Sequence, residues 1–322
     1  MDRNLALEFV RVTEAAAIAA ARWVGRGEKN KADGAAVDEM RKRFNQIYFS
    51  GTVVIGEGEK DEAPELYNGE HVGKAKTPLM DLAIDPLECT DSVAHGRYNA
   101  LTVIAAGASG SLLHAPDTYM DKLATGPEAA KVIDLDDSIT NNIKKTAKAI
   151  GKDVREITIM MLDRERNYSI MNEARSIGAK VRLISDGDVA AAVATCLPES
   201  GVDLLMGSGG STEGVLSAVA LKIFGGEILC RFKPKKETDI AKIKSMGIKN
   251  LKKIFSASDL AKGNQLTFTA TGVIDGPFLQ GVIFRKNRTI THSIVMRAQS
   301  KTIRYITTHH HLHQTNKYYE TT

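Results

Sequence analysis

The chain has 322 residues, of which 43% are hydrophobic and 25% charged, a composition typical of a globular protein long enough for two packed domains. Its most apolar runs, Ala15 to Ala21 and Leu101 to Ala106, are far shorter than the roughly 20 residues of a membrane-spanning helix, so no membrane partner is expected. The net charge is only +4, and the basic runs lack interleaved aromatic residues, so we expect no nucleic-acid partner.

The amino terminus begins an amphipathic pattern rather than the apolar core of an export signal. The three cysteines, Cys89, Cys196 and Cys230, are too few and too scattered for a disulfide framework or a zinc site. We therefore expect a cytoplasmic protein with reduced thiols.

The first half of the chain begins with helical patterns and continues with strand patterns. Apolar residues recur at steps of three and four from Asn4 to Arg26, which predicts a first helix. A second helix is expected to begin near Gly34, with Asp33 as its N-cap. Four short apolar runs then predict strands of one sheet, the last two forming a hairpin: 52–55, 79–84, 100–106 and 111–114.

The second half alternates between the two patterns. After a helix near residues 139–150, the pattern predicts three strands (157–162, 181–185 and 202–206) and three helices (167–177, 188–196 and 213–224). Beyond Gly263, residues rich in Thr, Ile, Val and Phe predict antiparallel strands to the end of the chain. We therefore expect two tightly packed α/β domains, 1–150 and 151–322.

Acidic residues recur at predicted strand ends and loop starts, where sites often form. If they converge, they cannot remain bare anions, because like charges a few ångströms apart repel strongly. Divalent cations would neutralise them, and oxygen ligands without nearby His or Cys favour Mg²⁺ or Mn²⁺ over zinc. Taken singly, Asp33 has a plainer interpretation as a helix cap and Asp85 as part of a turn before Pro86. The acidic set is Asp33, Glu57, Asp85, Glu88 and Glu213.

One motif points to a known family. The run Asp85-Pro86-Leu87-Glu88-Cys89-Thr90 resembles the Asp-Pro-x-Glu-Gly-Thr motif of class II fructose-1,6-bisphosphatases. These enzymes belong to the lithium-sensitive, metal-dependent phosphatases, together with the inositol monophosphatases. The likeness covers nearly the whole chain, through five further motifs in the family's order and spacing: Lys31-Ala32-Asp33, Gly56-Glu57-Gly58-Glu59, Ala115-Pro116-Asp117-Thr118-Tyr119-Met120, Asp186-Gly187-Asp188-Val189-Ala190, and Gly207-Ser208-Gly209-Gly210-Ser211-Thr212-Glu213-Gly214.

The resemblance implies a layered α-β-α-β-α sandwich of the fructose-1,6-bisphosphatase and inositol monophosphatase type. It implies one cation at Asp33 and Glu57 and a second at Asp85, Glu88 and Glu213, so the N-terminal domain would carry most of the metal carboxylates and the C-terminal domain would complete the sugar-phosphate site. The implied substrate-binding residues are Glu88, Cys89, Thr90, Tyr119, Arg164, Glu165, Arg166, Asp186, Gly187, Asp188 and Gly210.

Catalysis is expected from Thr90, Glu57 and Asp85. The Thr90 hydroxyl would hold the attacking water and relay its proton to a carboxylate such as Glu57. Arg164 and Arg166 offer charged donors for a second phosphate, although a solvated ion pair is the plainer interpretation of both. Packing alone is likewise the plainer interpretation of Tyr119.

Cys89 replaces the glycine of the family motif, and two interpretations stay open. Either the backbone there has a negative φ that accepts a small side chain, or the thiol at a helix N-terminus has a lowered pKa and is open to oxidation. A positive φ would instead cost about 1 kcal/mol or more. The histidines between Thr308 and His313 are expected to lie in a disordered end that binds metals only incidentally.

The resulting hypothesis is a Mg²⁺- or Mn²⁺-dependent fructose-1,6-bisphosphatase of gluconeogenesis, a homodimer or homotetramer by family likeness. Sedoheptulose 1,7-bisphosphate is the nearest alternative substrate, because it presents the same 1-phosphate end. A protein of another class, a sugar-phosphate sensor without turnover, is the alternative that the altered Cys89 motif leaves open. Inositol monophosphatase activity is disfavoured, because Arg164 and Arg166 would have no second phosphate to bind.

Overall fold

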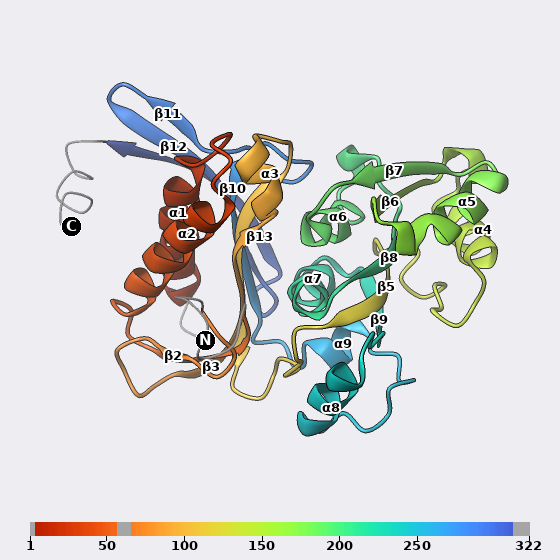
Figure 1. Ribbon diagram of the computed structural model, residues 1–322, viewed down its shortest axis with the longest axis horizontal. Helices are drawn as coiled ribbons and strands as arrows, with labels where there is room; N and C mark the ends of the chain where they lie inside the picture. Colours follow the sequence, from red (N-terminus) through yellow and green to blue (C-terminus); the bar gives the residue numbers. More distant parts are fainter. Residues whose placement is uncertain (1–3, 57–65, 312–322) are drawn as a thin grey trace.

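The computed structural model describes residues 4–56 and 66–311, which form five alternating layers of helices and sheets (Figure 1). Helices α1 and α2 cover one sheet, α6 and α7 fill the space between the two sheets, and α4 and α5 lie on the far side of the second. The predicted α-β-α-β-α sandwich is confirmed. None of the helices in the described part of the chain is both long and apolar enough to cross a membrane.

The first layer consists of α1 (Leu5–Ala21) and α2 (Lys29–Phe44), two helices whose inner faces are apolar. Phe9 of α1 meets Phe44 of α2 and Phe49 below it edge to face, with ring centroids 6.0 and 5.5 Å apart. This aromatic contact joins both helices to the first sheet.

Asp33 is not the N-cap of α2, because that helix begins four residues earlier, at Lys29. No Gly or Pro lies between Glu28 and Asp33, so nothing in this polar segment prevents helix formation. Asp33 is therefore a half-buried side chain within the helix.

The first sheet has eight strands in the order β11-β12-β10-β4-β3-β1-β2, with β13 on the other side of β12. Only β1 and β3 are parallel, and the strands beyond Gly263 are antiparallel as predicted. The bounds are β1 (Ser50–Ile55), β2 (His71–Val72), β3 (Leu79–Glu88), β4 (Ala100–Ala108), β10 (Thr267–Ile274), β11 (Ile283–Arg285), β12 (Arg288–Arg297) and β13 (Thr302–His311).

Two predictions about this sheet are wrong. Residues 111–114 do not return beside β4, because β3 and β10 occupy its two edges, and Leu112 makes only an isolated bridge to Ala261. His309, His310 and His311 are not in a disordered end but in β13, where His310 Nε2 lies 2.9 Å from Thr291 Oγ1. His313 lies outside the described residues.

The second sheet has five strands in the order β7-β6-β8-β5-β9. Two of them, β5 and β9, were not predicted as strands, and β5 lies in the interior of the sheet between β8 and β9. The bounds are β5 (Tyr119–Thr125), β6 (Thr158–Leu162), β7 (Lys180–Ile184), β8 (Leu204–Gly210) and β9 (Glu227–Phe232).

The remaining helices follow the prediction closely for α4 (Ile139–Ile150), α5 (Tyr168–Ser176), α6 (Asp188–Ala194) and α7 (Ser211–Phe224). The buried side of α7 packs against both sheets, and its small residues Ala218 and Ala220 allow that close approach. The other α-helices of the described residues are short: α3 (Thr90–His95), α8 (Glu237–Ser245) and α9 (Ala257–Leu260).

The chain crosses between the two sheets more than once. Strand β5 precedes residue 150 yet belongs to the second sheet, whereas β10 to β13 follow that residue and belong to the first. The expected domain boundary at residue 150 stays a prediction, and sheet membership divides the chain in a different way.

Candidate active site

Strand β3 carries two buried carboxylates at its carboxyl end. It continues past Ile84 through Asp85 and Pro86 to Glu88, with a shift in its pairing register against β4. Such an irregularity redirects side chains at the end of a strand. The Asp85 Oδ1 atom accepts a hydrogen bond from the Leu87 amide at 3.1 Å. Glu88 Oε1 accepts one from the Val189 amide of α6 at 2.8 Å, so this carboxylate reaches from the first sheet to the middle helix layer.

Cys89 follows in a left-handed conformation, with φ 75° and ψ 47°. The predicted negative φ is therefore wrong, and the thiol occupies a position whose backbone favours glycine. Its side chain is buried, with Asn99 Nδ2 donating to Sγ at 3.7 Å. A Cβ atom added to Gly187 would lie 2.2 Å from Sγ, so the Cys89 thiol leaves no room for a side chain at residue 187.

The Cys89 thiol is also not activated. Burial and the neighbouring Glu88 carboxylate raise its pKa well above the ordinary value, and Asp186, Asp85 and Asp188 act in the same direction. In the protein without bound cations the pKa of this thiol is therefore raised, and the lowered pKa expected beside bound cations stays a prediction. Helix α3 does begin at Thr90, as expected.

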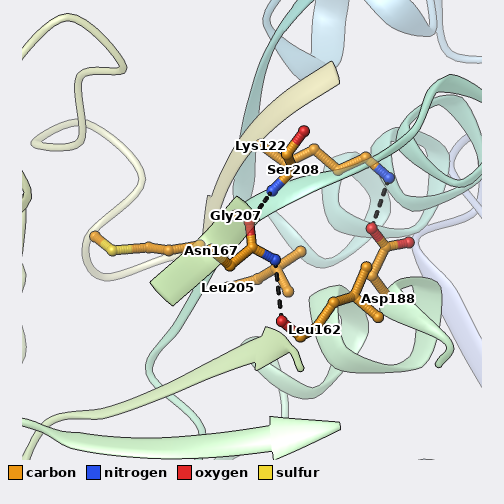
Figure 2. A pocket seen from close by; sticks show the side chains of 8 residues that line it. Lys122, Leu162, Asn167, Asp188, Leu205, Gly207 and Ser208 are labelled. Carbon is orange, nitrogen blue, oxygen red and sulfur yellow. Dashed lines mark hydrogen bonds and ion pairs between the residues drawn. The ribbon is translucent and has the colours of Figure 1, made fainter. Parts of the chain in front are cut away.

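A buried lysine, Lys122 of β5, lies among carboxylates from the two middle helices. Figure 2 shows its Nζ atom directed at Asp188 of α6, and the distance to Asp188 Oδ2 is 2.7 Å. Glu213, in the first turn of α7, places Oε2 at 3.9 Å from the same nitrogen. Lys122 was not predicted as a site residue because β5 was not predicted as a strand. The alternation of this strand places Met120, Lys122 and Ala124 on one buried face.

These acidic residues influence one another electrostatically. Burial, followed by repulsion from Asp188, raises the pKa of Glu88 well above its usual value, and Glu213 and Asp186 add to the effect. Burial raises the pKa of Glu213 to about 7, against the attraction of Lys122. Burial is the largest cause that raises the pKa of Asp186, and repulsion from Asp91 is the next. The folded chain thus concentrates more negative charge here than its own cations offset.

An open pocket of about 530 Å³ lies beside this cluster. The carboxylates Asp186 and Glu213 line it together with basic side chains. The predicted residues that line it are Tyr119, Arg164, Arg166, Asp186, Gly210 and Glu213. Four further charged residues that line it, Asp117, Lys235, Lys236 and Asp239, were not predicted as site residues, although Asp117 stands in one of the motifs.

The two arginines of this pocket are held by main-chain oxygens rather than by carboxylates. Arg166 Nε donates to Ser208 O at 2.9 Å, and Arg164 Nη1 donates to Asp163 O at 3.0 Å. Within residues 4–56 and 66–311, no carboxylate lies at ion-pair distance from either guanidinium. Glu165, between them in sequence, is exposed and does not line the pocket.

The remaining predicted residues lie around this centre. Thr90 is half-buried at the start of α3, and Asp33 is half-buried on α2. The ion pair between Lys29 and Asp91, with Nζ and Oδ1 3.1 Å apart, joins the beginning of α2 to α3. Glu57 lies outside the described residues.

The donor set suits a hard divalent cation. Glu88 Oε2 and Asp188 Oδ1 are buried and have no hydrogen-bond partner in the described part of the chain, and the carboxylates of Asp188, Glu213 and Asp186 lie near enough to Glu88 to raise its pKa. As the described side chains stand, no three acidic, histidine or cysteine residues are close enough to enclose an ion. In kind, though not in their present positions, these oxygen donors fit a hard divalent cation.

The layered fold, with buried carboxylates beside a pocket lined by basic side chains, defines a phosphatase of the metal-assisted kind. Residues 3–310 match the family described as bacterial fructose-1,6-bisphosphatase, glpX-encoded. The chain belongs to this family.

Named relatives agree with this assignment. Fructose-1,6-bisphosphatase 1 class 2 of Escherichia coli (strain K12) is 43% identical over 325 residues, covering 97% of this chain and 96% of the relative. The fructose-1,6-bisphosphatase class 2 of Shigella flexneri gives the same figures.

Among solved structures, the inositol monophosphatase from Anabaena (Nostoc) sp. PCC 7120 covers 75% of this chain and 88% of its own, with 15% identity and a TM-score of 0.39.

Proposed function

We propose that this chain hydrolyses the 1-phosphate of fructose 1,6-bisphosphate, giving fructose 6-phosphate and inorganic phosphate. The observation that carries the proposal is the near full-length membership of a family whose relatives bear that name. The pocket supports it, because carboxylates that could hold cations and basic groups that could bind a phosphate line it together, as a substrate with two phosphates requires.

The carboxylates Asp33, Glu57, Asp85, Glu88 and Glu213 would hold divalent cations, with Mn²⁺ or Mg²⁺ as the proposed ions. When bound, such cations offset the charge of the phosphoryl group and lower the pKa of a coordinated water. The contribution of the protein is to collect the acidic side chains. Glu88 is fixed by the Val189 amide, and Lys122 balances part of the charge of Asp188 and Glu213.

The reacting phosphate would lie at the start of α3. The amides of Cys89, Thr90 and Asp91 are proposed to contact its oxygens, and the Thr90 hydroxyl to hold the attacking water and pass its proton to a carboxylate such as Glu57. Asp85 would orient this arrangement from the end of β3. In this role Thr90 acts on the water and not on the sugar.

The sugar and the second phosphate would extend into the open pocket. Asp186 and Asp188 offer acceptors for sugar hydroxyls, while Arg164 and Arg166 offer charged donors for the distal phosphate. Gly210 permits close approach, because a Cβ atom there would lie 2.2 Å from Glu213 Oε2. Tyr119 forms part of the wall between these groups.

The family likeness also supports proposals about the location, the subunit number and the metabolic role of the enzyme. We propose a cytoplasmic homodimer or homotetramer that acts in gluconeogenesis. Sedoheptulose 1,7-bisphosphate remains a second substrate, since it presents the same 1-phosphate end and differs by one carbon.

The test is phosphate release by the purified protein with Mn²⁺ or Mg²⁺, on both bisphosphates, with and without a chelator. We expect turnover of fructose 1,6-bisphosphate that the chelator abolishes and either ion restores. The ratio of kcat/KM values ranks the two substrates. Binding of fructose 1,6-bisphosphate without phosphate release under any condition would instead identify a sensor and overturn the proposed enzymatic function.

A further inference from the structure

Two cations are drawn to one aromatic ring in the wall of the pocket. The Nζ atom of Lys235 lies 3.5 Å from the centroid of the Tyr119 ring, and Cζ of Arg166 lies 4.8 Å from the same centroid. Tyr119 comes from β5, Arg166 from the segment after β6, and Lys235 from the connection between β9 and α8. One strand of the second sheet and two connecting segments therefore meet at this ring.

The position of Lys235 is fixed by its backbone. The Lys233 amide donates to Tyr119 O at 2.8 Å, which continues the pairing of β9 with β5. The amides of Lys235 and Lys236 then donate hydrogen bonds to Asp239 Oδ2, at 2.8 and 3.0 Å. Backbone hydrogen bonds therefore hold the connection on both sides of Lys235 and place its side chain at the pocket.

The basic side chains of this wall share the pocket with four carboxylates, Asp117, Asp186, Glu213 and Asp239, but do not pair directly with them. Arg164, Arg166, Lys235 and Lys236 all line the pocket, and in the described ranges none of the four has a carboxylate at ion-pair distance. Residues 233–253 contain eight lysines and only two carboxylates. Because none of the four cations is held in an ion pair by the residues that the structure describes, each is available to bind an anionic group that enters the cavity.

We propose that Lys235, with Tyr119 as its support, binds the distal phosphate of the substrate and sets the preference for bisphosphates over monophosphates. This inference rests on the proposed function, and it adds a residue from a third segment to the two arginines. On substrate entry, the ammonium group exchanges its contact with the ring for a charge-assisted hydrogen bond to a phosphate oxygen. Its short distance to the Tyr119 ring keeps it directed at the pocket before the substrate arrives.

The alternative is that Lys235 only anchors the connection between β9 and α8. In that case, its loss would disturb the wall of the pocket for every ligand alike. The proposal instead requires a loss confined to ligands that carry the distal phosphate. Fructose 1-phosphate lacks that group and fructose 6-phosphate retains it, so this pair of compounds separates the two roles.

The experiment compares Lys235→Gln with wild type on fructose 1,6-bisphosphate and fructose 1-phosphate. We expect kcat/KM for the bisphosphate to fall about 10- to 100-fold, as for loss of a hydrogen bond to a charged group, and kcat/KM for fructose 1-phosphate to stay within about twofold. Lys235→Arg should retain most of the preference. Lys252→Gln is the matched control, because it removes an exposed charge from the same basic segment without lining the pocket.

Binding measurements keep the proposal testable if a variant loses turnover. By calorimetry with chelator present, which prevents turnover, Lys235→Gln should weaken fructose 6-phosphate binding about 10-fold or more and leave fructose 1-phosphate binding within about twofold. Tyr119→Leu should weaken fructose 6-phosphate binding as well, and the double variant should lose less than the two single losses combined, since the ring acts partly through the lysine.

Equal losses on both sugar phosphates, or wild-type behaviour of Lys235→Gln on both, would overturn the proposal while the wild-type activity on fructose 1,6-bisphosphate stands. Absence of that wild-type activity would instead count against the proposed function itself. The two failures are therefore distinguished by the wild-type assay alone.

Discussion

Lys122 Nζ and Asp188 Oδ2 form an ion pair of 2.7 Å in the buried space between the two sheets, with side-chain exposures of 2% and 6% (Figure 2). Burying either charge alone would be costly, because the interior cannot replace its hydration. The pair instead joins β5 of the second sheet to α6 of the middle layer. Glu213 of α7 lies at the edge of the same arrangement, 3.9 Å from the lysine nitrogen.

Replacing Lys122 by Met should therefore destabilise the protein, because Asp188 and Glu213 would face each other without a cation. We expect the free energy of unfolding to fall by about 3–5 kcal/mol, as for removal of one partner of a buried pair. Urea denaturation measures the change. The control is Lys145→Met, which breaks an ion pair to Asp137 of the same 2.7 Å length on an exposed surface and should leave the denaturation midpoint unchanged. Similar losses in both variants would show that burial is not the cause.

Glu213 should make the stability of the cation-free protein depend on pH. Its folded pKa of about 7 lies above its ordinary value of 4.5, so the folded state binds its proton more tightly than the unfolded state. The resulting stability is fully present below the ordinary pKa and is lost as the pH rises through about 7.

With chelator present, we therefore expect the free energy of unfolding to decrease from about pH 5 to about pH 8 and Glu213→Gln to flatten that decrease. Addition of Mn²⁺ at the higher pH should raise the wild-type melting temperature, since a ligand of the native state stabilises it. An unchanged slope in Glu213→Gln would assign the titration to other groups.

Helices and strands with clear periodicity were predicted well from sequence. The pattern near residues 139–150 matches α4 at both ends, because it has an amphipathic face and a Ser138 cap and ends at Gly151. The hairpin after β4 failed because the true partner, β10, lies more than 150 residues further along the chain. Local sequence carries no signal for such a distant pairing.

The site shows the same limit. Motif likeness selected Glu88 and Asp188, which the fold brings together across 100 residues through the Val189 amide. It did not select Lys122 or Lys235, because the residues around each lysine in the sequence resemble those of an ordinary solvent-exposed segment. The backbone at Cys89 was also mispredicted, since a φ angle depends on the turn that tertiary contacts impose there.

The left-handed conformation of Cys89 predicts an unusual order of stability among its variants. Glycine normally lowers stability relative to alanine, because it has more freedom in the unfolded chain. At φ 75° the order should reverse, since alanine keeps the steric cost that glycine avoids. We expect Cys89→Gly to be more stable than Cys89→Ala by about 1 kcal/mol in urea denaturation.

The comparison between these two variants is informative because both remove the thiol, together with its contacts to Asn99 and Gly187. The cost of losing the buried sulfur is therefore the same in both variants. The difference between their free energies of unfolding reports the cost of the left-handed backbone conformation. The matched pair at Ala94, a buried helical residue, should show the usual order, with Ala94→Gly less stable than wild type. Finding alanine more stable than glycine at both positions would contradict the strain at Cys89.

Thr90 provides the sharpest test of the proposed proton path. Thr90→Val keeps the shape of the side chain and removes the hydroxyl, so it should lower kcat on fructose 1,6-bisphosphate about 10²- to 10⁴-fold, the usual contribution of a positioned acid or base. Thr90→Ser should retain most of kcat, because its hydroxyl can still hold the water. Calorimetric binding of fructose 6-phosphate serves as the control and should change little in either variant, since that product lacks the reacting phosphate. Full turnover by Thr90→Val would remove the threonine from the mechanism and leave water activation to the carboxylates alone.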